Sequence, residues 1–214
     1  MVISDWISKN FIEIFGAVTG IIYVFLEIRQ TIWLWPVGII TSAVYIWVFF
    51  TSKFYADMSL QGYYLVISCL GWYWWTKGTG QKKEEEKGRM GEGEKEELQV
   101  TRLKLRTSIV LVIVFVLLYA AMWFVLTRLT DSPVPVRDSF ITSLSIIATW
   151  MLARKIYEHW YLWIVINFVS AVLFLTRGLY PTVILYVVYG IMSFAGLVEW
   201  KKTIKTDLTA RKNE

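Results

Sequence analysis

Long apolar segments alternate with short polar ones along most of the chain. The apolar segments run for about 16–21 residues, close to the length that an α-helix needs to cross the hydrocarbon core of a bilayer. We therefore predict an all-α integral membrane protein with seven transmembrane helices, over residues 11–28, 33–51, 57–76, 107–127, 138–153, 159–176 and 181–200. The fifth segment is the shortest and carries Thr142, Ser143 and Ser145, so we expect this helix to lie inside the bundle.

The spans contain an internal repeat. Residues 35–75, moved along the chain by 125 positions, align with residues 160–200 without a gap. Identical residues then coincide: Trp35 with Trp160, Tyr64 with Tyr189, Gly71 with Gly196 and Trp75 with Trp200. Because the matches include Trp, Tyr and Gly, shared hydrophobicity alone does not explain them. A duplicated membrane unit is typical of transporters.

The seven spans divide as three, one and three. The single helix at 107–127 inverts the chain, so both triplets enter the membrane in the same direction. We expect two parallel three-helix repeats, 11–76 and 138–200, related by an axis along the membrane normal. A charged linker at 77–106 joins the first repeat to the single helix, and a basic tail follows at 201–214. The linker contains the run KKEEEKGRMGEGEKEE, which predicts a solvated, flexible segment.

Composition and charge support the membrane assignment and set its orientation. Apolar residues make up 56% of the chain, and the mean hydropathy is +0.50. The net charge of +5 does not indicate nucleic acid binding, because Lys and Arg gather at the ends of the spans. One side of the membrane carries five of them and the other seventeen; the five are Lys9, Lys53, Arg128, Arg137 and Arg177. The positive-inside rule then places the N-terminus outside and the linker and C-terminus in the cytoplasm, as in a multi-pass protein of the bacterial inner membrane.

Polar and aromatic side chains recur on one face of four spans. Trp160, Trp163 and Asn167 share a face of the sixth span, at spacings of three and four residues. The corresponding faces of the other spans carry Ser42, Tyr45, Gln61, Tyr64, Tyr186 and Tyr189. Polar groups inside a bilayer usually face a cavity or the bundle interior. We therefore predict that these residues form a substrate-binding site between the repeats, and that their differences at equivalent positions suit an asymmetric ligand.

Each candidate also has a purely structural interpretation. Asn167 and Gln61 could hydrogen-bond only to neighbouring helices, and Trp163 could serve only packing. We expect Glu27 to reach the membrane interface and His159, the single histidine, to lie at the surface. No spacing of His, Cys and carboxylates suggests a metal site, and no nucleophile stands beside a base. The sequence therefore predicts no catalytic residue, no metal, no cofactor and no enzymatic activity.

Several strings in the spans carry a resemblance to a known family. They are WLWPVGI (33–39), YADMSLQGYY (55–64), GWYWW (71–75), WYLWIVIN (160–167) and LTRGLY (175–180). Together they resemble the PnuC family of vitamin transporters, over nearly the whole membrane portion. The pattern Trp160-x-x-Trp163-x-x-x-Asn167 resembles the nicotinamide riboside branch most, whereas sister branches take thiamine or riboflavin.

The resemblance implies a SWEET-like fold and facilitated diffusion of nicotinamide riboside by alternating access, without ion coupling. It also implies that a cytoplasmic riboside kinase traps the substrate, and it is compatible with a homotrimer. The residues suit such a ligand, because aromatic faces attract a pyridinium cation and amides pair with a carboxamide or with ribose hydroxyls. Two other interpretations stay open: a carrier of another B vitamin or a small sugar, and a membrane protein that binds without transport.

Overall fold

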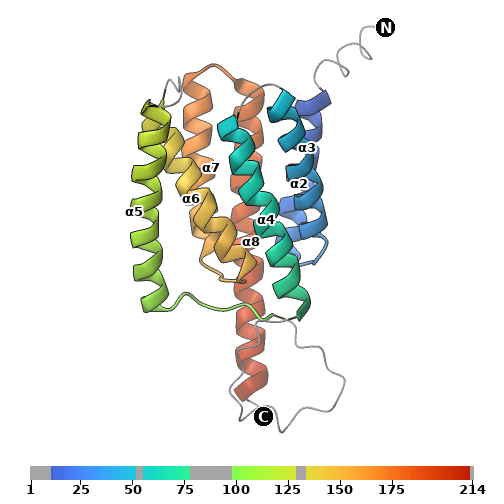
Figure 1. Ribbon diagram of the computed structural model, residues 1–214. Helices are drawn as coiled ribbons and strands as arrows, with labels where there is room; N and C mark the ends of the chain where they lie inside the picture. The colour runs from blue at the N-terminus through green and yellow to red at the C-terminus, as the bar shows by residue number, and fades with distance from the viewer. Residues whose placement is uncertain (1–10, 52–54, 78–97, 129–133, 213–214) are drawn as a thin grey trace, which may run out of the picture.

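The computed structural model describes residues 11–51, 55–77, 98–128 and 134–212. Within these residues the chain forms seven helices, shown in Figure 1: α2 (Phe11–Ile28), α3 (Leu34–Thr51), α4 (Tyr55–Lys77), α5 (Leu105–Arg128), α6 (Pro135–Ala153), α7 (His159–Thr176) and α8 (Tyr180–Lys212). Each predicted span coincides with one helix, which confirms the expected fold class. The expectations for Lys9, Lys53 and linker residues 78–97 lie outside the described part of the chain.

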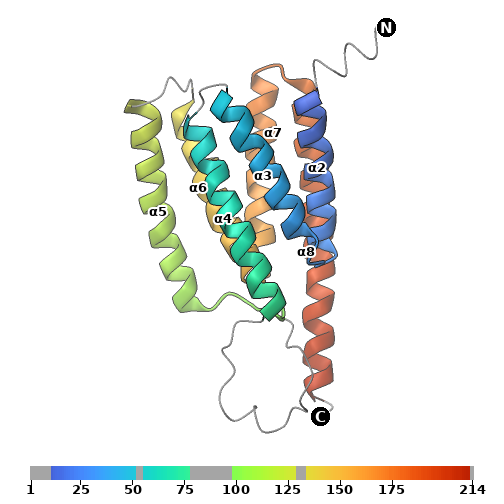
Figure 2. The same cartoon turned by 45° about the vertical axis from the view of Figure 1, so that its right-hand side comes forward.

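Six of the helices form a closed ring. The neighbours in contact are α2 with α3, α3 with α4, α4 with α6, α6 with α7, α7 with α8 and α8 with α2. Helix α5 stands outside this ring and packs on α6, as Figure 2 shows at the edge of the bundle. The first helix of each triplet thus packs against the third helix of the other triplet. Two equivalent interfaces, α2–α8 and α4–α6, therefore join the repeats.

The two triplets run in parallel. Helices α2 and α6 both begin at the upper end of the bundle in Figure 1, and α5 returns the chain to that end between them. We call the opposite end, where α2, α4 and α6 terminate, the inner end of the bundle. Helix α8 continues past it, because its 33 residues exceed what a bilayer core of about 30 Å requires at about 1.5 Å per residue. The first part of the predicted basic tail is therefore helical.

The turns at the inner end repeat as well. Gln30 and Lys155 lie 125 positions apart, and both have a positive φ, of 54° and 50°. The same backbone hydrogen bond closes the helix before each turn: Thr31 N donates to Leu26 O at 3.0 Å, and Ile156 N donates to Met151 O at 2.9 Å. These are matched Schellman-type helix ends. The internal repeat is thus preserved in backbone geometry where the side chains have diverged.

The outer surface of the ring suits a bilayer. Large apolar side chains are exposed on every helix, and α5 has no buried residue among those described. Four segments qualify as spans by length and hydropathy alone: Leu34–Thr51, Leu105–Arg128, His159–Thr176 and Tyr180–Thr206. Helices α4 and α6 are less apolar because they carry polar side chains on their inward faces. Helix α6 is largely buried, which confirms that the most polar span lies inside the bundle.

Residues 98–104 differ from the predicted linker. The Thr101 N–H donates to the Lys155 carbonyl at 2.9 Å, and the Tyr157 N–H donates to the Thr101 carbonyl at 2.9 Å. Leu98 is buried in the same core cluster as Tyr157. Gln99, Thr101, Arg102 and Lys104 are exposed, as expected of a solvated linker, but the segment also satisfies backbone groups of the α6–α7 turn and buries the Leu98 side chain.

Candidate functional site

The helical ring encloses a cavity of about 440 Å³, and all six of its helices contribute lining side chains. Every site residue predicted from the sequence lies among them: Ser42, Tyr45, Gln61, Tyr64, Trp160, Trp163, Asn167, Tyr186 and Tyr189. Helical periodicity thus identified side chains that share one cavity. Their part in binding stays a prediction.

One wall of the cavity holds a fixed amide. The Asn167 Nδ2 donates to the Ser193 hydroxyl at 3.1 Å, and that hydroxyl donates to the Tyr189 carbonyl at 2.8 Å. Asn167 therefore does bond to the neighbouring helix, as the structural interpretation expected. An amide has a second N–H and an oxygen, however, and Asn167 lines the cavity. Ser193 thus orients the amide and leaves it able to bind a ligand.

Two indoles on the same helix as this amide carry unused donors. The Nε1 atoms of Trp160 and Trp163 are buried, and neither has a hydrogen-bond partner among the described residues. Buried N–H groups in folded proteins are nearly always paired. Because both residues line the cavity, a ligand oxygen there could satisfy one of these donors.

Tyrosines make up much of the remaining wall. Tyr186 stacks on Phe174 with ring centroids 5.3 Å apart and an interplanar angle of 17°, and it meets Tyr189 edge-on at 6.0 Å. The Tyr64 hydroxyl lies beside Ser145 of α6. Gln61 stands one turn before Tyr64 on the cavity side of α4. The cavity is thus aromatic and neutral-polar.

Glycines on α2 make room for two of these tyrosines. A Cβ at Gly16 would overlap the Tyr45 hydroxyl, and a Cβ at Gly20 would overlap the Tyr189 hydroxyl. Both glycines line the cavity. These two glycines were not among the site residues predicted from the sequence, although their four-residue spacing within α2 is typical of close packing between membrane helices.

Glu27 supplies the only carboxyl group among the described lining residues, which include no Lys or Arg. The expectation that Glu27 reaches the interface is wrong, because this side chain is 1% exposed and lies 3.0 Å from His159 Nε2. The expectation of a surface histidine is wrong too, since His159 is fully buried. Glu27 lies at the end of α2 and His159 at the start of α7, and neither position in the sequence indicates that the two helices meet at the inner end of the bundle. No described group of His, Cys, Asp and Glu residues could hold a metal ion.

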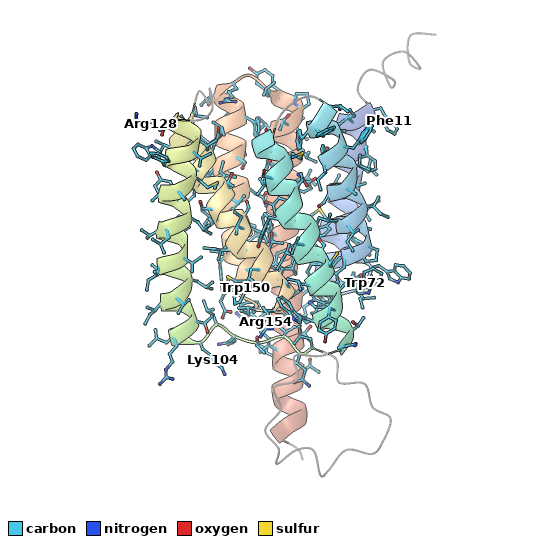
Figure 3. All side chains as sticks on the ribbon, viewed as in Figure 1. Phe11, Trp72, Lys104, Arg128, Trp150 and Arg154 are labelled. Atoms are coloured by element: carbon cyan, nitrogen blue, oxygen red, sulfur yellow. The ribbon has the colours of Figure 1, made fainter. Side chains whose placement is uncertain are left out.

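Four tryptophans close the cavity at the inner end. Trp35 meets Trp75 edge-on at 5.4 Å in one repeat, and Trp160 meets Trp200 edge-on at 5.8 Å in the other. Three of them are completely buried, and Trp75 is nearly so. They belong to a core cluster that fills this end of the bundle, so the cavity has a packed floor on the inner side. Figure 3 shows the dense side chains around Trp150 and Arg154 at this level.

Sequence comparison places the chain among known transporters. The profile of the nicotinamide mononucleotide transporter family matches residues 10–202. The nicotinamide riboside transporter PnuC of Escherichia coli is 27% identical over 203 residues, which cover 89% of this chain and 85% of that protein. The riboflavin/roseoflavin transporter RibM of Streptomyces davaonensis is 23% identical over 188 residues, covering 88% and 83% respectively.

Structural comparison agrees with the sequence. The crystal structure of the vitamin B3 transporter PnuC superposes with a TM-score of 0.71 at 25% identity, covering 96% of this chain and 86% of that one. The similar proteins are membrane transporters and not enzymes. The match of the family profile spans nearly all of the membrane portion. The chain therefore belongs to the nicotinamide mononucleotide transporter family, which includes the PnuC proteins.

Proposed function

We propose that this protein is a facilitative transporter of nicotinamide riboside that works by alternating access. The observation that carries the proposal is the chemistry of the cavity between two parallel repeats. Its described lining is aromatic and neutral-polar, with no Lys or Arg among the lining residues. Transported solutes commonly bind at the interface of such repeats, near the midplane of the bilayer.

The lining favours a nucleoside over a nucleotide. A phosphate carries close to two negative charges near neutral pH, and burial without a cationic partner is very unfavourable. The described lining residues offer no such partner, because they include no Lys or Arg. The pyridinium ring of nicotinamide riboside is instead attracted to the faces of Trp163, Tyr186 and Tyr189. The substrate is thus expected to be the riboside, although the family is named after the mononucleotide.

Hydrogen bonding would orient the ligand. A carboxamide needs both a donor and an acceptor, and the amides of Asn167 and Gln61 each provide both. The unpaired Trp163 Nε1 supplies a further donor for an oxygen of the ligand. Gln61 lies on α4 of the first repeat and Asn167 on α7 of the second. The substrate would therefore bridge the two repeats.

Net uptake follows from trapping. A facilitative carrier equilibrates its substrate, so accumulation requires that the substrate be removed inside the cell. A cytoplasmic riboside kinase would do so, because the phosphorylated product finds no cationic partner among the described lining residues. This part of the proposal places the inner end of the bundle in the cytoplasm of a bacterial cell, in agreement with the excess of Lys and Arg on that side.

Riboflavin is the second candidate substrate. The similarity to RibM favours it, and tyrosines can stack on an isoalloxazine ring as well as on a pyridinium. Riboflavin is neutral, however, so it would gain nothing from the cation-attracting faces of the aromatic rings. Competition between the two vitamins separates the candidates.

Exchange in proteoliposomes tests the proposal. Vesicles preloaded with unlabelled nicotinamide riboside should accelerate the entry of labelled riboside, and the mononucleotide should compete at least about a hundredfold more weakly. Thiamine, riboflavin and a small sugar complete the panel, and vesicles without protein are the control. Exchange of riboflavin without exchange of the riboside would replace the first candidate by the second. Tight binding without exchange would mark a binding protein.

A further inference from the structure

The inner end of the bundle holds a buried polar pair that the binding site does not need. Glu27 of α2 and His159 of α7 are 1% and 0% exposed, and their Oε1 and Nε2 atoms lie 3.0 Å apart. The rings of Trp160 and Trp200 lie 4.7 Å from the imidazole, so water is largely excluded around it. Glu27 also lines the cavity, which places the pair at the boundary between the cavity and its floor.

The hydrogen bonds of His159 define the state of the pair. The Nδ1 atom lies 2.7 Å from the Ile156 carbonyl, which can only accept, so Nδ1 carries a hydrogen. The contact between Nε2 and the Glu27 carboxyl then requires one more proton between them. The pair is net neutral whichever of the two atoms carries that proton. A buried pair of this kind is tolerated because it is neutral and hydrogen-bonded.

In the other repeat, apolar side chains occupy the positions equivalent to Glu27 and His159. At the offset of 125 positions, Leu152 corresponds to Glu27 and Leu34 corresponds to His159. Both leucines are completely buried in the core cluster of the inner end. The equivalent contact at the inner end is thus apolar in one half of the molecule and polar in the other. Packing alone therefore does not require polar side chains at this contact.

Further bonds at this level cross between the repeats. The Trp200 Nε1 donates to the Glu27 carbonyl at 3.0 Å, and the Trp75 Nε1 donates to the Ala153 carbonyl at 3.2 Å. Each joins the third helix of one repeat to the last turn of the first helix of the other. A path from the cavity to the inner side would have to separate α2 from α8 or α4 from α6 at this level. The Glu27–His159 pair, which joins α2 to α7, lies at the same end of the bundle.

We propose that the Glu27–His159 pair is a polar latch of the inner gate, closed here and broken each time the cavity opens to the cytoplasm. The inference rests on the proposed transport function. An apolar contact between the repeats would lose favourable burial when the gate opens, whereas both members of the polar pair regain hydration when cytoplasmic water enters. The hydrogen-bonded pair therefore joins the two repeats in the closed state. It also makes opening less unfavourable than an apolar contact at the same place would. Glu27 and His159 are positioning residues and need not touch the substrate.

The test compares three variants by binding, by transport and by access to the gate. Glu27→Leu with His159→Leu copies the apolar closure of the other repeat. Glu27→Leu alone leaves the Nε2 atom of His159 without its partner, while Nδ1 keeps its bond to the Ile156 carbonyl. Glu27→Gln keeps a side chain that can donate to Nε2. Glu199→Gln removes an exposed ion pair with Lys202 on α8 and serves as the control.

Access to the gate is read from the cytoplasmic side. The fully buried Ala153 is replaced by cysteine (Ala153→Cys) in a Cys69→Ala background, and a membrane-impermeant thiol reagent is applied to inside-out vesicles. The same proteins are assayed for external substrate binding and for exchange in proteoliposomes. Thermal unfolding in detergent reports whether each variant is folded.

The latch predicts opposite changes in two of the variants. The double leucine variant should bind external substrate as the parent does but exchange it at least about tenfold more slowly, with slower labelling, because an apolar gate opens less often. Glu27→Leu alone should label at least about tenfold faster and bind external substrate more weakly, because the closed state becomes less populated. Glu27→Gln and Glu199→Gln should stay near the parent.

Two results would overturn the latch. The first is a folded double variant that exchanges substrate at the parental rate, since a merely structural pair can be replaced by well-packed apolar residues without loss of function. The second is unchanged labelling in both leucine variants. If the parent neither binds nor exchanges nicotinamide riboside, the proposed function fails by itself, while thiol labelling in the Ala153→Cys background still decides whether the pair holds the gate.

Discussion

At the scale of single residues, the proposed function gives the main binding role to the aromatic and amide groups that line the cavity from both repeats. Trp163→Ala removes a ring face and an unpaired donor, and Asn167→Leu leaves polar atoms of the ligand unmet at about 1–3 kcal/mol each. Each variant should weaken substrate binding at least about tenfold, since about 1.4 kcal/mol corresponds to a factor of ten. Isothermal titration of the purified proteins measures the change.

A matched control separates this effect from general damage to the bundle. Trp47 lies on α3 and is 69% exposed on the outer surface, so Trp47→Ala should bind substrate as the parent does. Gln61→Leu should behave like Asn167→Leu. Parental affinity in all three site variants, with intact folding, would mean that the ligand binds elsewhere.

A second residue-level prediction concerns Gly71 and Gly196, which pack against tryptophan rings at the inner end. A Cβ at Gly71 would overlap the Trp35 ring, and one at Gly196 would overlap the Trp160 ring, whereas a Cβ at Gly62 meets nothing within 4 Å. Gly71→Ala and Gly196→Ala should each destabilise the protein by about 1–3 kcal/mol through overpacking. Gly62→Ala should be neutral or slightly stabilising, because Ala favours the helix. Thermal unfolding in detergent ranks the three, and a Gly196→Ala protein as stable as Gly62→Ala would contradict the tight closure.

Residue-level patterns predicted the cavity better than its floor. Spacings of three and four residues bring Trp163 and Asn167 to one helical face, and this local geometry survives in the fold. The contact between Glu27 and His159 depends on how two ends of distant helices meet, which no local spacing encodes. The repeat held an indirect signal, because Leu34 and Leu152 occupy the equivalent apolar positions.

At the scale of elements, the helices follow from the length of the apolar segments, because a bilayer core fixes the length that a helix needs to cross it. Hydropathy predicts less about the segments that lie outside the bilayer. Helix α8 continues to Lys212, and residues 98–104 bond to the α6–α7 turn. The second feature joins segments far apart in the sequence through backbone groups, so composition could not predict it.

The orientation of α5 is a testable statement about the whole topology. Lys104 and Arg128 lie at opposite ends of this helix, as Figure 3 shows, and both are exposed. In a Cys69→Ala background, Arg128→Cys should react with an impermeant thiol reagent in intact cells, because the side with fewer basic residues faces outward. Lys104→Cys should react only after the membrane is permeabilised. The reverse pattern would invert the proposed orientation.

At the scale of the whole molecule, the internal repeat predicted two parallel triplets joined by one inverting helix. It could not predict which helices meet between the triplets, because hydropathy does not encode partners. In the structure, six helices form a closed ring in which α2 packs on α8 and α4 packs on α6. That arrangement gives one cavity shared by both repeats and one floor made of equivalent tryptophans. The proposed alternation between the two sides would therefore need a change only at the α2–α8 and α4–α6 interfaces, with each repeat left intact.

The mechanism of the whole molecule yields the last prediction. Proton coupling needs a group that titrates as the site alternates between the two sides, and sodium coupling needs a cluster of oxygen ligands, usually beside unwound helix. The described cavity has neither an acid cluster nor a broken helix, and its one carboxyl is held in a net-neutral pair. Nicotinamide riboside should therefore equilibrate across sealed liposomes and ignore an imposed pH or sodium gradient. Accumulation driven by a pH gradient, with no kinase present, would contradict facilitated diffusion and would identify the proton shared by Glu27 and His159 as the coupling group to examine first.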